Sequence, residues 1–124
     1  MGNASAIELA ALQLDAVLDV SDNPTILTNE DGIIARWNKA AEDFYGYSTD
    51  EAVGQPVAVM CAVDPAHDSD EELRRVCGGD TLRDVDTVHR RRDGVSVPVS
   101  LTIAPLRDAA GNVVGTVRVT RNVT

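Results

Sequence analysis

The N-terminal part of the chain carries apolar residues at the spacing of one helical face. Four of them follow one another at intervals of four, three and four residues: Ile7, Ala11, Leu14 and Leu18. Such intervals place side chains on one side of an α-helix. The helix should end before Asn23-Pro24, because a proline pushes its predecessor out of the helical region. This apolar face must cover either the sheet of its own domain or a second copy of the chain.

Residues 25–37 are typical of a β-hairpin that leads directly into a helix. Two short β-prone runs, 25–29 and 33–37, flank Asp31-Gly32, a dipeptide suited to tight hairpin turns. Asn38 then suits the N-cap of a helix, since its side chain accepts a hydrogen bond from an unpaired first-turn amide. Gly46 suits the helix end, where a left-handed backbone is common.

Short helical segments are predicted in the middle of the chain. Ser48 and Glu51 form a capping-box pattern, in which each side chain satisfies the other residue's backbone amide. A further helix begins near Asp64-Pro65 or Ser69 and ends at Gly78-Gly79. Its acidic first turn suits the positive end of a helix dipole.

From residue 82 onward the apolar period changes to two. In the longest run, five apolar residues alternate with polar ones: Val95, Val97, Val99, Leu101 and Ile103. Turn residues at 93–94 and 108–112 divide this region into three strands, near 81–92, 95–103 and 113–123. Two strands, several short helices and three strands predict an α+β fold, an antiparallel sheet with these helices on one face.

Composition limits the classes of function. A net charge of −9 argues against a nucleic-acid partner, because that affinity comes from Lys and Arg neutralising phosphates. No apolar run approaches the roughly 18 residues that span a bilayer, and the N-terminus lacks a signal-peptide pattern. We therefore expect a cytoplasmic protein with no membrane partner. Cys61 and Cys77 are expected to be reduced thiols, and with the two histidines they match no zinc spacing.

Several ordered segments resemble the PAS domain family. Residues 31–42, with Asp-Gly-Ile-Ile and Trp-Asn-Lys-Ala-Ala-Glu, resemble its first hairpin and crossover. Residues 44–54, Phe-Tyr-Gly-Tyr-Ser followed by Glu51 and Gly54, resemble its GYS-x-E-E-x-x-G segment. Residues 91–124 resemble its long C-terminal hairpin and closing RD-[IV]-T motif, although Asn122 stands where Asp is usual.

The resemblance covers about residues 20–124 and implies a five-stranded sheet in the order 2-1-5-4-3. We therefore divide the chain into an N-terminal amphipathic helix at residues 1–20 and a PAS domain at residues 21–124. The family implies a sensory input module of a larger signalling protein, such as a two-component system. The downstream effector domain is expected outside this chain. We expect a homodimer formed through Ile7, Ala11, Leu14 and Leu18.

In this family the helices enclose a cavity that often holds a ligand. Inward positions of the predicted elements give six candidate lining residues: Met60, Leu73, Val76, Val85, Leu101 and Val117. Each is equally well a plain core residue. Their character predicts a small apolar ligand, and the alternative is a ligand-free dimerisation scaffold with a packed core.

Two cofactor hypotheses follow from the same resemblance. His67-Asp68-Ser69 resembles the haem-ligating segment of oxygen-sensing PAS proteins, so a haem-binding gas sensor is a further alternative. The flavin-binding branch carries its reactive cysteine where this chain has Val57, and Cys61 is expected on a different face. The cofactor is therefore left open. The two histidines lie on different elements with no nucleophile–base–orienter set, so we expect no enzymatic activity.

Overall fold

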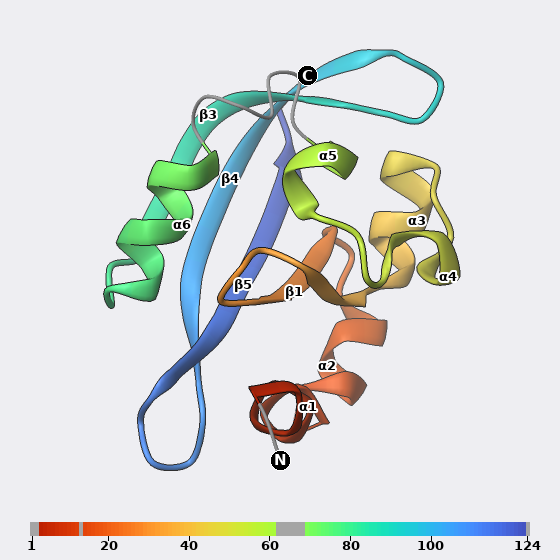
Figure 1. Cartoon of the computed structure of the whole chain (residues 1–124). Coiled ribbons are helices and arrows are strands. Elements are labelled where there is room, and N and C mark those ends of the chain that lie inside the picture. Colours follow the sequence, from red (N-terminus) through yellow and green to blue (C-terminus); the bar gives the residue numbers. More distant parts are fainter. Residues whose placement is uncertain (1–2, 13, 62–68, 124) are drawn as a thin grey trace.

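The structure is a computed structural model and describes residues 3–12, 14–61 and 69–123. Five strands form one antiparallel sheet in the order β2-β1-β5-β4-β3, which confirms the predicted topology. The strands are β1 (Thr25–Asn29), β2 (Ile34–Trp37), β3 (Leu82–Arg90), β4 (Ser96–Arg107) and β5 (Val113–Asn122). The last strand in sequence is therefore the central strand of the sheet (Figure 1).

Four short helices connect β2 to β3: α3 (Lys39–Tyr45), α4 (Thr49–Ala52), α5 (Val57–Cys61) and α6 (Ser69–Cys77). The predicted helix ends are confirmed. The Asn38 side chain accepts a hydrogen bond from the Ala41 amide, and Gly46 ends α3 with a φ of 86°. Ser48 and Glu51 form both bonds of the capping box that starts α4. Local turn chemistry thus sets the crossover between the two halves of the sheet.

The two faces of the sheet bury different clusters. Ile26 of β1 packs with Tyr45 of α3 on one face. Its neighbour Leu27 packs with Ile7 of the N-terminal region on the other face. Successive residues of a strand point to opposite faces, so both faces of the sheet are covered around β1. Polar side chains of the neighbouring β5 that point to the face under α3–α6, such as Arg118 and Thr120, are consequently buried.

The N-terminal region differs from the prediction of a single helix. It forms α1 (Asn3–Leu12) and α2 (Asp15–Val20). The residues predicted to hold a partner chain instead cover the domain's own sheet, since Ile7, Ala11 and Leu18 are buried and Leu14 packs against them. A dimer through these four residues would require α1 to leave the sheet. The outward side carries exposed apolar residues: Leu9, Leu12, Val17 and Val20.

Among residues 3–12, 14–61 and 69–123, no helix has the length and the apolar character needed to cross a bilayer.

Candidate functional site

A chain of hydrogen bonds joins three elements inside the domain, on the face covered by α3–α6. The Tyr45 hydroxyl, at the end of α3, lies 2.8 Å from Nδ1 of His89 on β3. It also lies 2.8 Å from Oγ1 of Thr120 on β5. Tyr45 has one proton to donate, so one of its two partners must donate to it. All three side chains are buried, Tyr45 completely.

Burial sets the protonation of this chain. It lowers the pKa of His89 to about 4, with a further contribution from the positive charge of Arg118. Burial also raises the pKa of Tyr45 well above its ordinary value. Burial disfavours the charged form of each group, so imidazole and phenol are both neutral at neutral pH. The chain is therefore a neutral link between α3 and the sheet.

Cys61 lies beside this chain, and its position corrects one expectation. Val57 and Cys61 are both buried in the cluster around Ile26 and Tyr45. The expectation that Cys61 lies on a different face from Val57 is wrong, because residues four apart in a helix share a face. Burial raises the pKa of the Cys61 thiol to about 12, against opposing effects of Arg118 and Tyr45. The thiol is therefore protonated and a weak nucleophile.

Arg118 is the charged member of the site. It is only 6% exposed and lies on the central strand β5, two residues before Thr120. Burial lowers the pKa of its guanidinium, while Cys61, Glu72, Tyr45 and Cys77 raise it. These groups belong to α5, α6 and α3. The guanidinium thus points to the same face as the Tyr45 chain.

The six predicted lining residues do not form one group. Val76, Leu101 and Val85 share a cluster on the face covered by α6. Met60 belongs to the cluster around Tyr45, and Leu73 lies near Gly32 in the β1–β2 turn. Val117 packs with the α1 cluster on the opposite face. Its side chain therefore points away from the other five, and the residues flanking it, Thr116 and Arg118, take the inner positions.

The haem hypothesis depends on His67, which lies outside the described residues. It stays a prediction.

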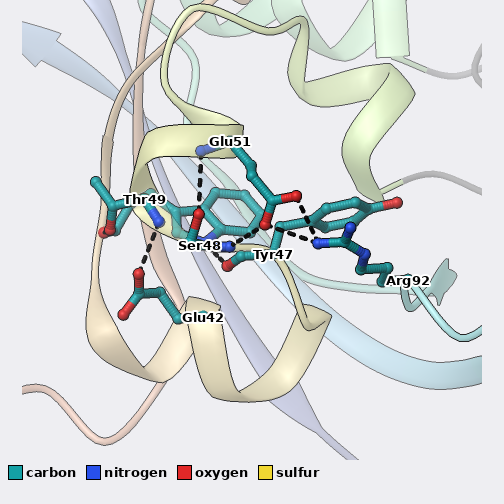
Figure 2. Close-up of polar contacts among 7 residues, drawn as sticks. Glu42, Tyr47, Ser48, Thr49, Glu51 and Arg92 are labelled. Carbon is teal, nitrogen blue, oxygen red and sulfur yellow. Dashed lines mark hydrogen bonds and ion pairs between the residues drawn. The ribbon is translucent and has the colours of Figure 1, made fainter.

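A second group of polar contacts surrounds the α3–α4 turn (Figure 2). The Glu51 carboxylate accepts a hydrogen bond from the Ser48 amide at 3.0 Å and one from Nη1 of Arg92 at 2.7 Å. The Arg92 guanidinium lies over the Tyr47 ring, 5.4 Å from its centroid. The Ser48 amide and Arg92 both lower the pKa of Glu51. These exposed contacts tie the β3–β4 turn to α4 and serve the fold.

The strand order of the sheet and the short helices between β2 and β3 define the class of fold. The chain matches the PAS domain family over residues 22–124 and belongs to that family. It is 24% identical over 110 residues to the cell-division control histidine kinase PdhS of Brucella ovis. That match covers 86% of this chain and 11% of the kinase. The chain therefore spans about a ninth of this relative.

Solved structures show the same fold. A PAS domain of a protein from Colwellia psychrerythraea superposes with a TM-score of 0.75 at 25% identity, covering 92% of this chain and 97% of that one. A domain of a sensory box sensor histidine kinase/response regulator from Geobacter sulfurreducens superposes with a TM-score of 0.73 at 20% identity. The superposition covers 93% of this chain and 96% of that domain. No catalytic domain accompanies the PAS domain within residues 22–124.

Sequence reasoning missed Tyr45, His89, Arg118 and Thr120 as site residues. A signal was present in β5, where Thr116, Arg118 and Thr120 alternate with valines. In a sheet with one solvated face, the valines would point inward. Because α1 covers the second face here, Val117 is half-buried against the α1 cluster, and the polar residues are buried under α3–α6.

Proposed function

We propose that this chain is a cytoplasmic sensory input domain of a larger signalling protein of the histidine-kinase type. A small molecule bound between the sheet and helices α5 and α6 would shift these helices relative to β5, and with them α3, whose Tyr45 packs against Met60 and Cys61 of α5. The change would then reach the C-terminal end of β5, where a downstream domain would follow. The family membership and the resemblance to histidine kinases support this proposal.

The observation that carries the proposal is the contact between Tyr45 and Thr120. Tyr45 ends α3, the first of the helices that cover the inner face, and Thr120 lies two residues before the end of β5. A hydroxyl pair at 2.8 Å is a directional contact. A displacement of α3 must therefore stretch this contact or move the end of β5 with it.

The proposed ligand would contact five residues predicted from the sequence: Met60, Leu73, Val76, Val85 and Leu101. They come from α5, α6, β3 and β4. Val117 is left out of this proposal because it packs on the α1 face.

The proposed homodimer would use the outward side of α1 and α2. Leu9 and Leu12 are 66% and 59% exposed, and Val17 and Val20 are 60% and 77% exposed. Several exposed apolar residues on adjacent helices are typical of association surfaces. A second copy of this chain offers the same apolar residues, as a two-fold interface requires.

Native mass spectrometry of the purified chain tests both parts of the proposal. We expect a dimer and the additional mass of a bound small molecule. Val17→Asp should yield monomers, because it places a charge in the proposed interface. Val95→Asp is the matched control, since Val95 is 50% exposed but lies in the β3–β4 turn.

Monomers in the unchanged protein would overturn the proposed dimer. A dimer without any bound mass, even after incubation with cell extract, would leave the ligand-free scaffold as the function.

A further inference from the structure

Arg118 lies in the middle of an apolar layer. In the sheet register it is paired with Ile26 of β1 on one side and Ile103 of β4 on the other. Ile26 is 1% exposed and Ile103 is fully buried. Residues directly opposite in a sheet share a face, and these isoleucines pack under α3–α5 and α6 respectively. The charge of Arg118 is therefore enclosed between the central strand and the helices.

The guanidinium is incompletely paired. Its Nε is buried and has no hydrogen-bond partner. The polar neighbours on the same strand face are already engaged. Thr116 is bonded to Thr28 at 2.6 Å, and Thr120 is bonded to Tyr45.

Three of the nearby ionisable groups bring no negative charge to Arg118. Burial raises the pKa of Tyr45, Cys61 and Cys77, so all three are uncharged at neutral pH. Glu72 of α6 acts on Arg118 as a negative charge. A buried guanidinium nitrogen without a hydrogen bond is costly. Such an unsatisfied group in a native structure calls for an explanation, and a bound molecule that accepts its hydrogen bond is one.

We propose that Arg118 binds the carboxylate of a small organic acid with an apolar body, held between β5 and helices α5 and α6. The inference rests on the proposed function, because it names the class of ligand that the sensor takes. The guanidinium fork matches a carboxylate through two parallel N–H···O bonds. The isoleucines on either side suit the hydrocarbon part of the ligand.

The charge count favours a carboxylate over a phosphate. A carboxylate brings one negative charge to a site that already includes Glu72, whereas a phosphate monoester brings nearly two at neutral pH. Glu72 would therefore repel a phosphate more strongly than a carboxylate. The neutral Tyr45, Cys61 and Cys77 add no positive charge that could hold the second charge.

Isothermal titration calorimetry with three acid and amide pairs tests this inference. The titrants are butyrate, hexanoate and octanoate, each compared with its primary amide of nearly the same shape. We expect at least one acid to bind about tenfold more tightly than its amide, as a charge-assisted pair would give. This preference should vanish in Arg118→Met, which keeps an unbranched apolar stem and removes the guanidinium.

Arg121→Met is the matched control, because Arg121 is an exposed arginine on the same strand. It should keep the preference for the acid. If Arg118→Met does not fold by circular dichroism, Arg118→Lys replaces it. That variant keeps the charge without the fork, and it should weaken the preference.

Acids that bind no more tightly than their amides, or a preference that survives the Arg118 variant, would overturn the inference. Amides that bind as well as the acids would leave the proposed sensor intact and remove only the ligand class. If none of the six compounds binds and native mass spectrometry finds no bound mass, the inference and the proposed ligand-binding function both fail.

Discussion

The hydroxyl group of Tyr45 lies 2.8 Å from Nδ1 of His89, which joins the end of α3 to edge strand β3 through the interior. The two rings are 5.7 Å apart between centroids. Because the same hydroxyl contacts Thr120, the Tyr45 side chain touches both an edge strand and the central strand. A single side chain thus spans the face of the sheet that the helices cover.

The first prediction concerns acid stability. The pKa of His89 is lowered to about 4 in the folded protein, below its ordinary value of 6.5. Between these values the unfolded state binds more protons, so the free energy of unfolding falls as pH falls through this window. Above the window this effect is absent. In urea denaturation, the free energy of unfolding of the wild type should fall by about 2 kcal/mol more than that of His89→Gln between about pH 6.5 and 4.5.

Glutamine retains an acceptor for Tyr45 and does not titrate, which makes it the appropriate comparison. Parallel stability profiles for the wild type and His89→Gln would contradict the burial of a neutral histidine.

The second prediction concerns Gly115, where β5 passes very close to β1. A Cβ at this position would lie 1.9 Å from the Thr28 carbonyl oxygen and 2.9 Å from Cδ1 of Ile7. The carbonyl oxygen belongs to the backbone and has little freedom to move. Gly115→Ala should therefore lower the free energy of unfolding by more than about 3 kcal/mol, or prevent folding.

Gly78→Ala is the matched control for this test. Its Cβ would meet backbone oxygens of Arg74 and Arg75 at 3.4 Å, and its φ is outside the left-handed region. It should change the free energy of unfolding by less than about 1 kcal/mol. Equal thermal stabilities of the two variants would contradict the close approach of β1 and β5.

The third prediction concerns Asn38, whose side chain connects α2, β1 and α3. Its Oδ1 accepts hydrogen bonds from the amides of Thr25 and Ala41, both at 2.9 Å. Its Nδ2 donates to the carbonyl oxygens of Leu18 and Asn23, at 3.0 and 3.1 Å. Asn38→Ala should lower the free energy of unfolding by about 3 kcal/mol or more. It leaves enclosed backbone groups unpaired in addition to removing a helix cap.

Ser48→Ala provides the comparison, since Ser48 caps α4 at an exposed site. Ser48→Ala should lower the free energy of unfolding by about 1 kcal/mol. Asn38→Asp keeps both accepted hydrogen bonds but cannot donate, so its loss of stability should lie between those of Ser48→Ala and Asn38→Ala. A cost for Asn38→Ala no larger than that of Ser48→Ala would show that only the cap matters.

Features encoded by a few neighbouring residues could be predicted from the sequence. The Asn38 cap, the Gly46 helix end and the capping box at Ser48 were all correct, because each depends on short-range backbone chemistry. The sheet order also followed correctly from the resemblance.

Features that depend on what covers a surface could not be predicted in the same way. The spacing of Ile7, Ala11, Leu14 and Leu18 identified an apolar face but left open what lies against it. The structure places the domain's own sheet there. Because α1 covers that second face, Val117 can point there, and Arg118 and Thr120 point to the interior under α3–α6. Alternation alone makes these two polar residues look solvent-exposed. The site was missed for this reason.

The proposed coupling of the helices to the C-terminal end of β5 passes through Tyr45, and amide hydrogen exchange of Tyr45→Phe is its most direct test. Tyr47→Phe is the matched control, because it removes a hydroxyl from the tyrosine that lies under Arg92. We expect faster exchange at residues 119–122 in Tyr45→Phe, with rates in Tyr47→Phe like those of the wild type. Equal exchange at these residues in both variants would contradict it.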